Sequence, residues 1–274
     1  MQIRFLQAVT DFVFEGGTIR MAFQHIRLDV WDQTATLTLA RPPLNIMNMA
    51  LMEEMVQALE SLKDRKSLRA LVIRAEGRVF CAGAAVEDHV GETTEPFIKL
   101  FHQVFRSMLK VPCPTVAVVE GAALGGGLEL VTFCDLVVAS ENAKFGQPEI
   151  NLALFAPVSA VVFPRLMSYH RMMELMLIGE PISARQACEW GLVNRLAPPD
   201  KVEEALNDLL QKLTSKSAAA LRANLMAVRA AAAEPFETAI DRVEKVYLDH
   251  IYSKDAQEGL YAFLEKRQPV WKDE

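Results

Sequence analysis

The chain has 274 residues, of which 51% are hydrophobic, and its formal net charge is −6. A chain of this length can bury a large core, so its stability need not depend on disulfides or bound metals. The acidic balance argues against nucleic acid or an anionic membrane as a partner, since both attract basic surfaces.

The cysteines and histidines indicate the redox environment of the protein and whether it binds a metal. The four cysteines lie far apart without a CxxC pair, which disfavours a zinc site or a disulfide framework and predicts buried thiols in a reducing cytoplasm. The five histidines are also scattered without ligand spacing, so we expect no metal. The uncharged apolar run 152–164 is short and contains Pro157, so it cannot span a bilayer as a helix. We therefore predict a cytoplasmic protein that does not enter a membrane.

The N-terminal part divides at a second methionine. Residues 1–20 precede Met21 and lack the architecture of a signal peptide, and we predict that they form an extension outside the core. From Ile26, apolar and polar residues alternate around Asp32 and the next residue, which predicts a β-hairpin. Asn48 is then a candidate cap for a helix that runs to about residue 63.

The middle of the chain alternates between strand and helix patterns. Buried strands are predicted over 70–77, 115–121 and 135–140, with helices over 97–109 and 124–133 between them. A strand, a helix and a strand in succession favour parallel pairing with right-handed crossovers.

Beyond residue 161 the helical patterns dominate. We expect helices over 171–178, 183–190, 201–213, 217–233, 235–252 and 254–267. The fold class is therefore α/β in its front half and α-helical in its tail. No linker marks a clean boundary, and we divide the chain into an extension (1–20), a core (21–200) and a helical C-terminal region (201–274).

The stretch GAALGGGLEL, residues 121–130, fits neither GxxxxGK[ST] nor GxGxxG. If the preceding strand leads into a helix near Gly125, backbone N–H groups in the first turn have no partner within the helix and suit a developing oxyanion. Glu129, three residues beyond Gly126, would share that face of the helix. The alternative is a tight turn in which Glu129 only complements the helix dipole.

Two further stretches add to this chemistry. KFGQPEI, residues 144–150, places Glu149 after a proline in a predicted loop, between apolar residues that would partly desolvate its carboxylate. Glu129 and Glu149 could then act as an acid/base pair. FCAGAAVED, residues 80–88, offers small residues at Gly83 and Ala84 that could expose another N–H, although an ordinary turn would look the same.

Together with EGLYAFLEKR, residues 258–267, these stretches resemble the enoyl-CoA hydratase/isomerase family, also called the crotonase superfamily, over residues 23–272. The resemblance implies a spiral of ββα units followed by an α-helical region that builds homotrimers, commonly paired into hexamers. It also implies an acyl-CoA substrate, with coenzyme A as part of the substrate thioester and no separate cofactor.

The resemblance assigns roles residue by residue. The N–H groups of Ala84 and Gly126 would form an oxyanion hole for the thioester carbonyl. Glu129 would activate a water that adds to Cβ, while Glu149 would donate a proton to Cα. Further substrate and CoA contacts would come from Leu44, Ala82, Pro157 and Val158, and from Phe263 and Lys266, which would meet the nucleotide end of CoA bound to a neighbouring subunit.

The sequence also departs from the family pattern. Ala85 replaces the usual aspartate after the oxyanion alanine, and Glu87 replaces a common lysine, so CoA is expected to be held differently. LFAPVSAVVFPRL, residues 154–166, replaces a glycine-rich segment and should reshape the acyl pocket. With RPPLNIMN, residues 41–48, this resembles the branch that hydrates cyclohexa-1,5-diene-1-carbonyl-CoA.

Two alternatives to a hydro-lyase remain. An enoyl-CoA isomerase or a thioester hydrolase could use the same scaffold, but many such relatives keep only one of the two glutamates. From a different class, the chain could bind acyl-CoA or act as a scaffold without catalysis. No GxSxG sequence surrounds Ser159, so a serine nucleophile is unsupported.

Overall fold

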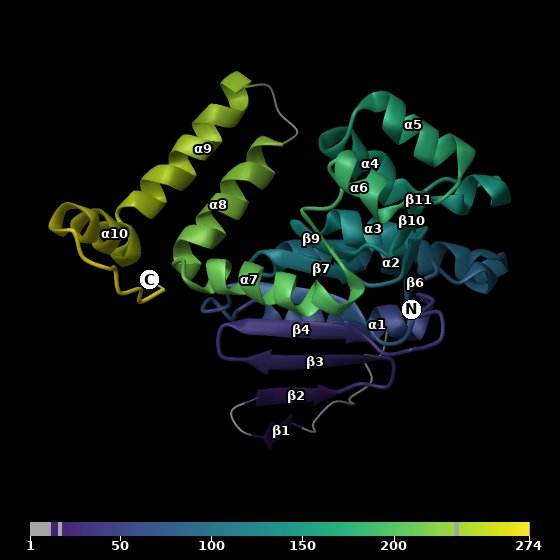
Figure 1. Cartoon of the computed structure of the whole chain (residues 1–274), viewed down its shortest axis with the longest axis horizontal. Helices are drawn as coiled ribbons and strands as arrows, with labels where there is room; N and C mark the ends of the chain where they lie inside the picture. Colours follow the sequence, from purple (N-terminus) through teal and green to yellow (C-terminus); the bar gives the residue numbers. More distant parts are fainter. Residues whose placement is uncertain (1–11, 16–17, 233–235, 274) are drawn as a thin grey trace.

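The computed structural model describes residues 12–15, 18–232 and 236–273, and within these residues the strands form a sheet of eight and a sheet of four (Figure 1). The larger sheet has the order β1-β2-β3-β4-β5-β7-β9-β12, and the smaller one the order β11-β10-β8-β6. The predicted extension lies partly outside the described residues, because residues 1–11 and 16–17 are not described. The described parts, β1 (Phe12–Glu15) and β2 (Thr18–Ala22), pair with each other, and β2 adds to the edge of the larger sheet.

The predicted hairpin is confirmed. Strands β3 (Ile26–Trp31) and β4 (Thr34–Leu39) pair antiparallel around a turn in which Asp32 has a positive φ of 47°. Ile26, Leu28 and Val30 are buried, which is the alternation that the sequence shows.

The predicted parallel pairing is confirmed as well. Strands β4, β5 (Ala70–Ala75), β7 (Thr115–Val119) and β9 (Leu136–Ser140) pair parallel in that order. The main core covers one face of these strands, and α7 (Val202–Thr214) covers Val72, Val116 and Val138 on the other. Burial on both faces explains why these strands are continuous apolar runs.

Two helices of the front half follow the sequence closely. Helix α1 (Met49–Leu62) begins where the side chain of Asn48 accepts a hydrogen bond from Leu51 N. Helix α2 (Thr94–Lys110) buries Phe97, Phe101 and Phe105, one turn apart, on the face that meets the core.

The smaller sheet was not predicted. It consists of β6 (Val79–Cys81), β8 (Ala122–Leu124), β10 (Lys144–Gly146) and β11 (Ile182–Ser183). The predicted strand over 115–121 ends earlier, at Val119, and the strand that leads into Gly125 is β8, which belongs to the smaller sheet. The predicted loop over 144–150 is also wrong, since it forms β10 and a 3₁₀ helix over Pro148–Leu152.

The helices around the glycines differ from the expected bounds. Helix α3 spans Gly126–Phe133, so it begins two residues later than the predicted 124. The segment expected to line a reshaped pocket forms another helix, α4 (Pro157–Leu166), with Pro157 in its first turn. Proline suits this position because the first N–H groups of a helix have no intrahelical partner.

Beyond residue 168 the chain is mainly helical, as predicted. The helices of this part are α5 (Tyr169–Ile178), α6 (Ala184–Glu189), α7, α8 (Ala218–Ala231), α9 (Phe236–Ile251) and α10 (Lys254–Glu265). The prediction missed β12 (Arg195–Ala197), which pairs parallel with β9 and completes the larger sheet. Figure 1 shows α8, α9 and α10 extending to one side of the two sheets.

All four cysteines are free thiols, but only three are fully buried. Cys81, Cys113 and Cys134 lie in the interior, and Cys188 in α6 is partly exposed, contrary to the expectation that all four are buried. Burial raises the pKa of Cys81 and Cys113 to about 12, which keeps these thiols protonated.

Candidate active site

The glycine stretch forms a sharp turn between β8 and α3. Gly125 has φ 54° and ψ −127°, a backbone conformation that is accessible essentially to glycine alone. Its N–H donates to Gly146 O over 2.9 Å, which ties the turn to β10. A Cβ atom on Gly125 would lie 2.6 Å from Oε1 of Glu149, so the missing side chain also makes room for that carboxylate.

The next two glycines bring the turn against the loop that follows β6. A Cβ on Gly127 would lie 2.4 Å from Cys81 O, so only glycine fits there. A Cβ on Gly126 would lie 3.1 Å from a ring carbon of Phe101 and 3.4 Å from Ala84 N. The structure therefore brings together Ala84 and Gly126, the two residues predicted to form an oxyanion hole.

Several backbone N–H groups near these two residues are occupied by backbone oxygens. Ala82 N donates to Leu44 O over 2.9 Å, Ala85 N donates to Met47 O over 3.0 Å, and Gly125 N donates to Gly146 O. No such backbone hydrogen bond involves the N–H of Ala84 or Gly126 within the part of the chain that the structure describes. Gly126 N is moreover in the first turn of α3, where the helix dipole is positive.

Leu44 and Ala82, predicted to contact the substrate, lie beside this pair. Their backbones are joined by the hydrogen bond between Ala82 N and Leu44 O, which holds the RPPLNIMN segment against the loop of Ala84. The side chain of Leu44 is exposed, whereas Ala82 is partly buried.

Glu129 is an ionisable group in the protein interior, with only 2% of its surface exposed. Its Oε1 accepts hydrogen bonds from Val158 N over 2.7 Å and from Ser159 N over 3.1 Å, both in the first turn of α4. Burial raises the pKa of Glu129 to about 7, with a smaller contribution from the negative charge of Glu149 and against the opposing effect of the two backbone hydrogen bonds. A pKa near 7 suits a group that must both take and release a proton at neutral pH.

Glu149 lies in the first turn of the 3₁₀ helix that follows β10. Its Oε2 is buried and has no hydrogen-bond partner among the described residues. Burial raises the pKa of Glu149, partly offset by its own backbone N–H, so its carboxyl group is poised to carry a proton. Glu149 Oε1 lies next to Gly125, the residue that precedes the helix carrying Glu129, so the two predicted glutamates lie near the same turn.

Pro157 and Val158 lie in the first turn of α4, and the contact between this turn and Glu129 was not predicted from the sequence. We expected their side chains to fill a pocket wall, and Val158 is indeed largely buried. Its backbone N–H, however, is what holds Glu129. Proline within an apolar run could have signalled a helix start whose free N–H groups bind a carboxylate.

Phe263 and Lys266 do not join the rest of the predicted site. Phe263 lies in α10 with 82% of its surface exposed, and Lys266 ends that helix with a positive φ of 56°. Figure 1 shows α10 well separated from α3 and α4, so within one chain these residues lie far from both glutamates.

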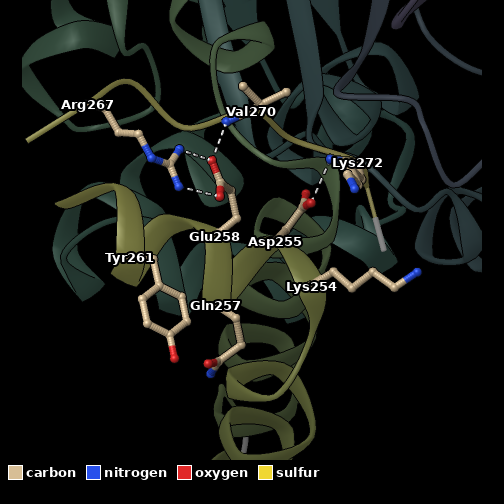
Figure 2. Close-up of a pocket in the computed structure, with 8 residues that line it drawn as sticks. All are labelled: Lys254, Asp255, Gln257, Glu258, Tyr261, Arg267, Val270 and Lys272. Carbon is tan, nitrogen blue, oxygen red and sulfur yellow. Dashed lines mark hydrogen bonds and ion pairs between the residues drawn. The ribbon is translucent and has the colours of Figure 1, made fainter. Parts of the chain in front are cut away.

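A hollow of about 510 Å³ lies beside α10, and none of the predicted site residues lines it. Figure 2 shows that both carboxylates of the hollow accept hydrogen bonds from the same chain: Glu258 from Arg267 and from Val270 N, and Asp255 from Lys272 N. These internal contacts fix the C-terminal tail to α10, and the glutamate pair remains the better candidate for chemistry.

N–H groups without a backbone partner near a buried carboxyl group are chemically suited to stabilising an enolate oxygen and moving a proton beside it. A family model described as enoyl-CoA hydratase/isomerase matches residues 32–274. The chain belongs to this family, as the motifs of its sequence predicted.

Individual relatives agree with the family. The chain is 36% identical over 238 residues to a cyclohexa-1,5-dienecarbonyl-CoA hydratase of Thauera aromatica, covering 86% of this chain and 92% of that protein. It is 33% identical to a probable enoyl-CoA hydratase of Bacillus subtilis, covering 91% of this chain and 99% of the relative. A crystal structure of an enoyl-CoA hydratase from Bacillus anthracis superposes with a TM-score of 0.86 at 30% identity, covering 92% of this chain and 100% of that one. The fold is therefore the crotonase fold, as predicted.

The described residues lack two features that would indicate other partners. They contain no group of three or more histidine, cysteine, aspartate or glutamate side chains arranged to hold a metal ion. Their helices are also too short or too polar for any of them to cross a membrane.

Proposed function

We propose that the protein is a hydro-lyase that adds water to the double bond of an α,β-unsaturated acyl-CoA thioester. The observation that carries the proposal is the position of the two glutamates around the glycine turn. Glu129 is buried in the helix that starts there, and Glu149 Oε1 would lie 2.6 Å from a Cβ on Gly125. Ala84 N and Gly126 N would donate to the thioester carbonyl oxygen, which gains negative charge as an enolate forms.

The glutamates would divide the proton transfers. Glu129, ionised, takes a proton from a water molecule as the water oxygen bonds to Cβ. Glu149, protonated, gives its proton to Cα, and the electron pair of the double bond forms the new Cα–H bond by way of the enolate. The substrate gains one water, and the single proton of the pair ends on Glu129. The raised pKa values of both glutamates favour such sharing, since burial disfavours the ionised form of each carboxyl group.

For the acyl group we propose a cyclic dienoyl-CoA ester. The relative of Thauera aromatica is named for such a substrate, and the first turn of α4 carries Pro157 and Val158 where the resemblance predicts small residues. Side chains there would shorten the space for a linear chain and leave room for a compact ring.

The second candidate is an isomerase or a thioester hydrolase on the same fold. The description of the matching family names isomerases beside hydratases. An isomerase needs to move a proton but not to activate water. The presence of both Glu129 and Glu149 near the glycine turn favours hydration, and it also argues against a member that only binds acyl-CoA.

We also propose that the chain works as a homotrimer or homohexamer. Large apolar side chains are exposed along the C-terminal helices: Tyr247, Leu248, Tyr252, Leu260, Tyr261, Phe263 and Leu264. Since Phe263 and Lys266 lie far from the glutamates of their own chain, they would serve CoA bound to a neighbour. The limits of the three predicted regions and the cytoplasmic location stay predictions.

The proposal is tested by following loss of the conjugated-thioester absorbance over a panel of linear and cyclic enoyl-CoA esters. We expect hydration, with a cyclic dienoyl-CoA ester used faster than crotonyl-CoA. A protein that isomerises or hydrolyses these esters without adding water would contradict it.

A further inference from the structure

A buried amide side chain lies behind the candidate base. Gln147, between β10 and the 3₁₀ helix, has only 2% of its surface exposed. Its Nε2 donates a hydrogen bond to Oγ of Ser159, which is fully buried in the first turn of α4. The contact persists for either orientation of the amide, because a hydroxyl group can both donate and accept.

This contact continues directly to the carboxylate of Glu129. The backbone N–H of Ser159, like that of Val158, donates to Oε1 of Glu129. The hydrogen bonds that reach Glu129 therefore converge on one oxygen, which leaves Oε2 to face the reacting water. The first turn of α4 has no side-chain cap, so its position depends on contacts of this kind.

The burial of the Gln147 amide requires an explanation. Its Oε1 is buried without a hydrogen-bond partner among the described residues. Burying an amide that is only partly satisfied costs free energy, and an apolar side chain of similar length would pack there without that cost. The hydrogen bond to Ser159 is the polar contact that the buried amide provides.

We propose that Gln147 and Ser159 are positioning residues for the hydration reaction. Their side-chain contact fixes the first turn of α4, so that its two N–H groups hold Oε1 of Glu129 and turn Oε2 toward the substrate. The proposal rests on the proposed function, in which Glu129 activates water.

The test uses Gln147→Met, Ser159→Ala and the double variant. Gln147→Met keeps the length of the side chain without the amide, and Ser159→Ala removes one oxygen but keeps the backbone N–H. Each should lower kcat about 10- to 100-fold and leave KM within about threefold, because the base is displaced while the CoA contacts remain. The double variant should be no slower than the slower single variant, since both remove the same contact.

The pH profile separates positioning from general damage. Hydrogen bonds to a carboxylate lower its pKa, so loosening the two N–H donors should move the acidic limb of kcat to higher pH by about one unit. The matched control is Ser140→Ala, another buried serine at the end of β9, whose Oγ accepts a hydrogen bond from Asn142 N. Its kcat and pH profile should equal those of the wild type.

A titration independent of turnover completes the test. NMR of the protein labelled with ¹³C at glutamate carboxyl groups, with Glu129 assigned by Glu129→Gln, should show an upward pKa shift of Glu129 in both single variants. Unchanged titration and kcat in folded Ser159→Ala would overturn the positioning role while leaving the proposed function standing. If the wild type hydrates no ester, the proposed function fails, and the titration alone still decides whether Gln147 and Ser159 position Glu129.

Discussion

Replacing Gly125 by alanine should damage catalysis far more than folding. The new Cβ would lie 2.6 Å from Glu149 Oε1, and reaching an ordinary contact of 3.4 Å moves that oxygen by about 0.8 Å. A misplacement of about 1 Å can cost ~10²-fold in rate, so we expect kcat to fall about 100-fold. Because the contact is with the end of a flexible side chain, the loss of stability comes mainly from backbone strain at φ 54°, about 1–3 kcal/mol.

The assay compares kcat and thermal unfolding with those of Gly77→Ala. Gly77 also has a positive φ, 84°, but its Cβ would meet only Pro42 Cβ at 3.5 Å, an ordinary contact. The control should lose a comparable few degrees of Tm and keep its activity. The reasoning is refuted if folded Gly125→Ala hydrates within about threefold of the wild-type rate.

Three further predictions follow from the same geometry. The pKa of Glu129 is about 7 when folded and ~4.3 when unfolded, so between these values the folded chain holds a proton that the unfolded chain releases, and stability falls as pH rises. Glu129→Gln should then be more stable than the wild type near pH 8, by up to ~3 kcal/mol in urea unfolding, with the gain vanishing near pH 4; a gain independent of pH would count against the shift. We expect the wild type to prefer a cyclic over a linear ester by roughly 10–200-fold in kcat/KM, and Val158→Gly should reduce this preference. If the wild type hydrates linear esters faster than cyclic ones, the pocket argument is wrong. Light scattering should give a trimer or a hexamer, and a stable, fully active monomer would contradict the assembly.

The part of the site that could be predicted from the sequence is the part that local rules determine. Glycine at Gly125 and a carboxylate one turn later indicate a helix start with free N–H groups, whatever the rest of the fold. The hairpin, the Asn48 cap and the parallel strands likewise depend on periodicity and capping within a few residues.

The parts that were missed depend on contacts distant in sequence. Strands β8 and β10 have three residues each, too few to show a period, and they exist because they pair with each other. Helix α4 contains β-branched residues and an internal Pro164, so local propensity disfavours it. A hydrogen bond such as that between Gln147 and Ser159 leaves no trace in composition or spacing.

The most direct test of the account is hydration of a cyclic dienoyl-CoA ester in H₂¹⁸O, followed by mass spectrometry for the wild type, Glu129→Gln, Glu149→Gln and the double variant. The account predicts one ¹⁸O atom in the wild-type product. Each single variant should be slower by ~10²–10⁴-fold with thioester binding largely intact, and the double variant should be little worse than either. A near-wild-type rate in either single variant would contradict a hydratase that works through two glutamates.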